Sequence, residues 1–120
     1  MVIQTNQNKM KTKTIDIQAK EWFDKVNGNS YFAGTITLNY GTETEETFLM
    51  PFQYGYGSQY EQEAKAILTQ FNKISTDYES LSNYCKRVGI ILRKNIQRNS
   101  LKRDLKAIEN RYNNNLKTTK

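Results

Sequence analysis

An apolar stripe after Ser58 constrains the fold of this chain more than any other feature does. Six apolar side chains recur there every three or four residues: Tyr60, Ala64, Ile67, Leu68, Phe71 and Ile74. This spacing places them on one face of a helix, and a stripe this broad must be buried against a core. Ser58 and Glu61 stand in the order of a capping box, in which a hydroxyl and a carboxylate each accept from a backbone amide. We therefore expect a long helix that begins at Ser58.

Three segments predict the strands of a small sheet. In residues 14–18 and 31–40 apolar and polar residues alternate, and residues 47–52 follow as a further strand. The polar connector 41–46 would join the last two strands in a hairpin. Pro51 suggests a sheet edge or a strand end, because proline donates no backbone hydrogen bond.

Residues 19–26 have helical rather than alternating spacing. Trp22, Phe23 and Val26 fall on one helical face. We therefore expect a short helix here, and Asn27-Gly28 would end it because both residues tolerate a positive φ.

The last third of the chain leaves one alternative open. Residues 76–87 predict a helix with one apolar side, formed by Tyr78, Leu81, Tyr84, Cys85 and Val88. Either this helix continues past Gly89, or Gly89 ends it and residues 90–96 form a strand, which their consecutive isoleucines favour. After Ser100 a further helical face follows, formed by Leu101, Leu105, Ile108 and Tyr112, before a polar tail from Asn113 onward.

These elements predict an α+β fold in which one long amphipathic helix packs on a small antiparallel or mixed sheet, with a basic C-terminal extension. The 120 residues allow one modest core. We expect residues 1–13 to form a flexible arm, residues 14–97 a single α+β domain, and residues 98–120 a basic helical extension and tail.

Charge is divided unevenly along the chain. Residues 86–120 contain eleven Lys or Arg and two acidic residues, a net charge of +9, whereas residues 1–85 contain seven basic and ten acidic residues, a net charge of −3. A basic end attracts polyanions. The guanidinium group of arginine can also form two parallel hydrogen bonds with a phosphate group. The candidate contacts with nucleic acid or another polyanion are Arg87, Arg93, Lys94, Arg98, Lys102, Arg103, Lys106 and Arg111. An acidic surface of a host protein complex would suit the same charges.

The loop before the long helix has two interpretations. It is a candidate ligand or base-stacking loop consisting of Tyr54, Gly55, Tyr56, Gly57 and Tyr60. Glycines let backbone amides approach a ligand, and tyrosine rings can stack on bases. Alternatively the loop is a structural turn with core tyrosines, because the capping box uses some of its amides and two nearby glutamates repel anions.

Two stretches resemble a known family. Residues 20–31 read Lys-Glu-Trp-Phe-Asp-Lys-Val-Asn-Gly-Asn-Ser-Tyr, and residues 51–60 read Pro-Phe-Gln-Tyr-Gly-Tyr-Gly-Ser-Gln-Tyr. Residues 14–75 resemble a family of short tailed-phage accessory proteins that share a Trp-Phe helix, a hairpin and a Tyr-Gly-Tyr-Gly element before a helix. The resemblance implies a phage or mobile-element accessory protein without a settled activity.

The residue types exclude several kinds of site. The chain has no histidine and one cysteine, Cys85, which excludes zinc sites and nucleophile–histidine pairs, and we expect neither a metal nor a cofactor. We expect Cys85 to be a buried structural thiol, and a lone cysteine fits a reducing cytoplasm, here that of a bacterial host. Apolar runs stay shorter than the roughly 18 residues of a membrane span, and the first residues lack the apolar stretch of a signal peptide.

These observations predict a non-catalytic protein that binds nucleic acid mainly through phosphates, with weak sequence specificity. One alternative is a protein–protein inhibitor of a host-defence complex, of the anti-CRISPR type, or of a transcription complex. Another is a protein that binds and sequesters a nucleotide in the Tyr-Gly loop.

Overall fold

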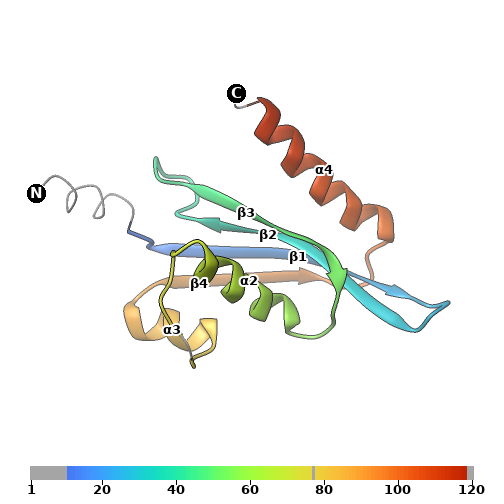
Figure 1. Cartoon of the computed structure of the whole chain (residues 1–120), viewed down its shortest axis with the longest axis horizontal. Helices are drawn as coiled ribbons and strands as arrows, with labels where there is room; N and C mark the ends of the chain where they lie inside the picture. Colours follow the sequence, from blue (N-terminus) through green and yellow to red (C-terminus); the bar gives the residue numbers. More distant parts are fainter. Residues whose placement is uncertain (1–10, 77, 119–120) are drawn as a thin grey trace, which may run out of the picture.

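The computed structural model describes residues 11–76 and 78–118, which form a mixed four-stranded sheet and three helices (Figure 1). The elements are β1 (Thr14–Asp24), β2 (Asn29–Leu38), β3 (Glu46–Tyr54), α2 (Gln59–Gln70), α3 (Leu81–Val88), β4 (Ile91–Gln97) and α4 (Lys102–Thr118). The expected α+β class and the small mixed sheet are confirmed. Residues 1–10 of the expected N-terminal arm lie outside the described residues.

The strands follow the order β3-β2-β1-β4 across the sheet. β1 pairs antiparallel with β2, and β2 pairs antiparallel with β3, which makes the expected hairpin part of a meander. β4 pairs with β1 in parallel. Parallel neighbours need a crossover connection, and the segment that contains α2 and α3 supplies it.

The short helix expected for residues 19–26 is wrong, because this segment continues β1 as far as Asp24. Trp22 pairs with Tyr31 of β2, in one ladder with the rest of the strand. A helix of eight residues is marginal alone, whereas pairing along all of β2 satisfies its backbone and suits aromatic side chains. Gly28, at φ 74°, closes the hairpin between β1 and β2, and its amide donates to the Asp24 carbonyl at 2.7 Å.

The main core lies between the sheet and the helices α2 and α3. Its buried residues are Ile15, Ile17, Ala19, Phe32, Ile36, Leu38, Met50, Tyr60, Ala64, Ile67, Leu68, Ile74, Leu81 and Cys85. Cys85 is buried as expected, and burial raises the pKa of its thiol. Phe71 differs from the expectation: α2 ends at Gln70, and Phe71 is 52% exposed, with its ring 5.2 Å from that of Phe48.

The expected capping box at the start of α2 is also wrong. Ser58 occupies the N-cap position, but its side chain makes no capping hydrogen bond. Its backbone, at φ −96° and ψ 13°, is not in the extended conformation that directs a capping hydroxyl toward the helix amides. The Oε1 atom of Gln59 instead accepts from the Tyr56 amide at 3.0 Å, and Glu61 forms an ion pair with Lys94 at 3.2 Å.

The segment after α2 settles the alternative left open by the sequence. Gly89 adopts the left-handed φ of 84°, α3 ends there, and the following residues form β4. The interpretation as a strand is therefore confirmed. The helix is shorter than expected, because Ser80 caps it by accepting from the Asn83 amide at 3.1 Å. Tyr78 precedes the helix and is 98% exposed.

The helix α4 covers the opposite face of the sheet from α2 and α3, and Figure 1 shows the sheet between them. Ala33 follows Phe32 in β2, and consecutive strand residues point to opposite faces. Ala33 packs with Leu105 and Ile108 of α4 in a second cluster, separate from the main core. Three helices therefore cover the sheet where one was expected. The segment expected to be a polar tail is helical from Asn113 to Thr118.

Candidate nucleic-acid interface

Ion pairs within the fold engage four of the eight basic residues predicted to bind polyanions. The pairs are Arg87–Glu79 at 2.7 Å, Arg93–Asp16 at 2.5 Å, Lys94–Glu61 at 3.2 Å and Arg98–Glu21 at 2.9 Å. Each basic residue comes from the basic third of the chain, and each acidic residue comes from residues 1–85. The fold thus cancels much of the charge separation that the linear sequence shows.

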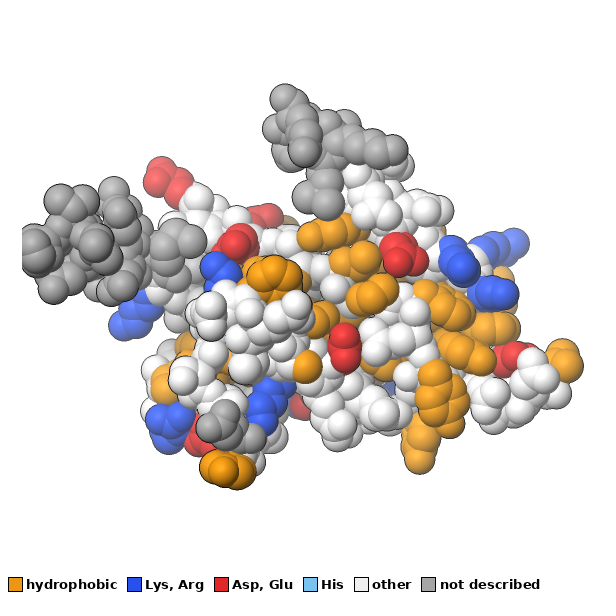
Figure 2. Space-filling view, in the orientation of Figure 1, with side chains coloured by type: hydrophobic (Ala, Val, Ile, Leu, Met, Phe, Trp, Pro, Cys, Tyr) orange, Lys and Arg blue, Asp and Glu red, His pale blue; other side chains and the backbone are white. Residues whose placement is uncertain are grey.

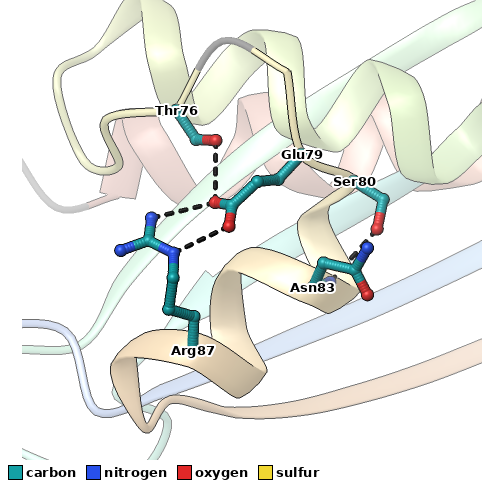
Figure 3. A network of polar contacts seen from close by, with 5 residues as sticks. All are labelled: Thr76, Glu79, Ser80, Asn83 and Arg87. Atoms are coloured by element: carbon teal, nitrogen blue, oxygen red, sulfur yellow. Dashed lines mark hydrogen bonds and ion pairs between the residues drawn. The ribbon is translucent and has the colours of Figure 1, made fainter.

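Arg87 belongs to a polar network that holds the connection between α2 and α3 (Figure 3). Its Nε and Nη2 atoms donate to the two oxygens of Glu79 at 2.7 and 2.9 Å, and the Thr76 hydroxyl donates to the same carboxylate at 3.0 Å. The Arg87 hydrogen bonds are the main cause that lowers the pKa of Glu79 to about 2. The network gives Arg87 a structural role.

The other four predicted residues, Lys102, Arg103, Lys106 and Arg111, all belong to α4. None of the ion pairs within residues 11–76 and 78–118 involves them. The acidic residue in the first turn, Asp104, is engaged elsewhere, because its Oδ2 atom accepts from the Leu101 amide at 2.9 Å. The predicted cations that form no ion pair in the described part of the chain are therefore all on α4.

Two of these lysines lie over aromatic rings. The Nζ atom of Lys102 is 5.7 Å from the ring centroid of Trp22, and that of Lys106 is 5.0 Å from the ring centroid of Phe52. An ammonium group within about 6 Å of a ring is attracted to its face, with about 0.5–1 kcal/mol at an exposed site. The rings thus position the two lysines without neutralising their charge.

The rings under these lysines form a continuous group. Tyr31 stacks with both Trp22 and Phe52, with centroid distances of 5.4 and 5.2 Å and interplanar angles of 25° and 16°, and the Trp22 and Phe52 centroids are 6.3 Å apart. Tyr54 meets Tyr31 edge-on, at 6.0 Å and 80°. We call these four rings with Lys102 and Lys106 the lysine–aromatic cluster. Figure 2 shows apolar and basic side chains side by side at the end of the molecule where α4 begins.

A β-bulge in β3 places part of the cluster on the face that α4 covers. The pairing of β2 with β3 shifts between Phe32 and Gly34, which leaves one extra residue in β3. Without that shift, alternation would put Phe52 on the same face as Met50, in the main core. With it, Phe52 packs in the second cluster, under α4. Pro51 falls within this irregular stretch, where the backbone donor that proline lacks is not needed.

Arg103 and Arg111 are the other predicted cations of α4. Arg103 is exposed. Arg111 lines a groove of about 250 Å³ between α4 and the polar side chains of β1 and β4, among them Gln18 and Asn95. The structure therefore brings Lys102 and Lys106 together with the aromatic rings but leaves Arg111 on a different flank of the same helix.

The Tyr-Gly loop combines structural and exposed residues. A Cβ atom added at Gly55 would lie 2.6 Å from Cε1 of Phe32, so packing requires glycine there. Tyr60 is 6% exposed in the main core, and burial is the largest cause that raises the pKa of its hydroxyl. Tyr54 and Tyr56 are 58% and 65% exposed. These contacts favour a structural turn at Gly55 and Tyr60, and leave Tyr54 in the lysine–aromatic cluster.

Sequence reasoning did not single out Trp22, Tyr31 or Phe52 as site residues. Trp22 was expected in a helix, and Phe52 was expected only as the last residue of a strand. The signal that could have found them is the pairing of aromatic residues across neighbouring strands, which becomes visible only when residues 19–26 are treated as a strand.

No helix within the described residues is long and apolar enough to cross a membrane. Comparison with known proteins found no matching family model, no matching curated protein and no matching solved structure. The resemblance to tailed-phage accessory proteins therefore stays a prediction.

Proposed function

We propose that this protein is a small non-catalytic binding protein that contacts nucleic acid mainly through phosphates, with Lys102, Arg103 and Lys106 as the principal contacts. The observation that carries the proposal is the distribution of charge in space. Ion pairs engage the predicted cations of α3, β4 and the turn after it, whereas no ion pair in the described part of the chain involves those of α4.

The geometry of α4 supports phosphate contact. Lys102, Arg103 and Lys106 stand within its first turn and a half, and all three are exposed. Lysine binds phosphate as a point charge, and arginine can add a forked contact. Contacts of this kind position a protein on the nucleic-acid backbone but carry no direct sequence information. We therefore expect similar affinity for unrelated sequences.

A salt titration with fluorescence anisotropy tests the proposal. Each phosphate contact releases counterions, so log K should fall with log salt by about 0.7–0.9 per contact. Replacing Lys102, Arg103 and Lys106 with Gln should weaken binding about equally for unrelated sequences and reduce the slope by about 2.

The matched control replaces Arg87, Arg93 and Arg98 with Gln, which removes the same three positive charges from ion-paired positions. The charges at these positions are already paired with Glu79, Asp16 and Glu21, so removing them should affect the affinity less. The control should keep most of the affinity, with thermal melts verifying that both variants fold. Equal losses in the two triple variants would contradict an interface on α4. Absence of binding to DNA and RNA, single- or double-stranded, at micromolar protein would reject nucleic acid and favour an acidic protein surface as the target.

A further inference from the structure

Tyr54 is the accessible ring of the lysine–aromatic cluster. The three other rings are half-buried and packed on one another. The ring contact of Tyr54 among the described residues is the T-shaped one with Tyr31, and Tyr54 is 58% exposed. More than half of its surface is therefore accessible to a ligand.

Strand pairing holds the backbone at Tyr54 in place before any ligand arrives. Tyr54 pairs with Tyr31 across β2 and β3, and Tyr31 pairs with Trp22 across β1 and β2. A backbone that is already ordered loses little conformational freedom on binding, which favours affinity. Gly55, directly after Tyr54, is held against the ring of Phe32, which restrains the end of the strand.

Cations border the same ring system. Lys102 lies over Trp22 and Lys106 over Phe52, and both rings contact Tyr31. The carboxylate of Asp24, which interacts electrostatically with Lys102, accepts hydrogen bonds from the Asn27 side chain at 2.9 Å and the Val26 amide at 3.0 Å. The hairpin turn thus engages that carboxylate, and no ion pair of the described residues involves Lys102 or Lys106.

An exposed aromatic ring in a cluster with cations matches a base attached to its phosphate backbone. Base–aromatic stacking tolerates any sequence, because every base has a π face. In a duplex these faces are covered by neighbouring base pairs, whereas a single strand presents them. We infer that the lysine–aromatic cluster selects single-stranded nucleic acid, with a base stacked on Tyr54 and phosphates held by Lys102 and Lys106. This inference rests on the proposed function and adds the kind of strand that the site prefers.

The test uses Trp22, the one tryptophan of the chain, as an internal fluorescent reporter within the cluster. The probes are a single-stranded oligothymidine, a DNA duplex of the same length, and inorganic polyphosphate, which has the charge but no bases. The variants are Tyr54→Leu, which removes the ring, and Tyr54→Phe, which keeps it. Tyr78→Leu is the matched control, because Tyr78 is an exposed tyrosine outside all the ring contacts of the described residues.

We expect the single strand to change Trp22 emission and to bind more tightly than the duplex. Tyr54→Leu should weaken single-strand binding about tenfold or more, from the typical energy of base stacking. It should leave the affinity for polyphosphate nearly unchanged. Tyr54→Phe and Tyr78→Leu should both bind the single strand like the wild type.

Two results would overturn the inference while the proposed function stands. One is equal affinity for single strand and duplex. The other is a Tyr54→Leu variant that binds the single strand as tightly as Tyr78→Leu does. If neither the single strand nor the duplex binds at micromolar protein, the proposed function itself fails, and the inference fails with it.

Discussion

Replacing Leu105 with alanine should release α4 from the sheet before the rest of the domain unfolds. Leu105 has no exposed surface and packs with Ala33 and Ile108, the other fully or nearly buried members of the second cluster. Leu→Ala at such a position typically costs about 2–5 kcal/mol. A whole domain of this size has about 5–15 kcal/mol of stability, and most of the buried side chains here belong to the main core. The lost stability should therefore first weaken the packing of α4 on the sheet, while the rest of the domain stays folded.

Two signals separate local from global unfolding. Trp22 emission reports on α4, because Lys102 lies over its ring and the ring packs against the second cluster. Far-ultraviolet circular dichroism reports mainly on the whole domain. In Leu105→Ala the transition in Trp22 emission should occur at a lower temperature than the main transition in circular dichroism. Nucleic-acid affinity should also fall, because Lys102 and Lys106 are no longer held over the rings of Trp22 and Phe52.

The control is Leu68→Ala, which makes the same chemical change at a side chain of the main core that also has no exposed surface. Both signals should move together in this variant, to a lower melting temperature. If Leu105→Ala also showed coincident transitions, α4 and the main core would form one cooperative unit, and the argument for a separately docked helix would be wrong.

Two further outcomes follow from the same contacts. Leu68→Ala should cost about 2–5 kcal/mol, whereas Phe71→Ala should cost distinctly less because Phe71 is 52% exposed; chemical denaturation of both variants checks this, and equal costs would contradict the end of α2 at Gln70. Arg87→Gln should raise the pKa of Glu79 from about 2 toward 4.5, as followed by carboxyl NMR titration. Since the folded pKa of Glu79 is lowered, its stabilising contribution is complete above pH 4.5 and is lost as the pH falls toward 2, so the wild type should lose more stability than the variant in that window. An unchanged Glu79 titration in the variant would show that the guanidinium is not the cause.

The sequence predicted the elements whose signals are local. The stripe from Tyr60 to Leu68 is buried, and Gly89 ends α3 before a strand, as its conformational freedom allows. These features depend on side-chain spacing and on the φ of one residue. Neither requires knowledge of which distant segment lies nearby, so a single sequence is enough to predict them.

The failures share one cause, which is pairing between distant segments. The spacing of Trp22, Phe23 and Val26 fits a helix, yet β2 offers residues 19–24 a complete hydrogen-bonding partner. Phe71 fits the stripe of α2 by spacing, but the helix ends one residue before it. In the first case strand pairing outweighs the helical spacing, and in the second the helix ends before the periodic pattern does. Both are expected because local propensity is only a weak preference.

For the same reason, the sequence predicted only part of the candidate interface. A count of charges identifies the basic third but cannot tell which cations have acidic partners, since Arg93 and Arg98 each pair with a residue 77 positions earlier. The parallel pairing of β4 with β1 creates these contacts. Topology therefore divides one basic segment into cations that form ion pairs, in α3, β4 and the following turn, and cations of α4 that form none within the described residues. The bulge near Pro51 then brings Phe52 under Lys106. A change that removed the bulge would turn Phe52 toward the main core and leave Lys106 without its ring, although no charge in the sequence would have changed.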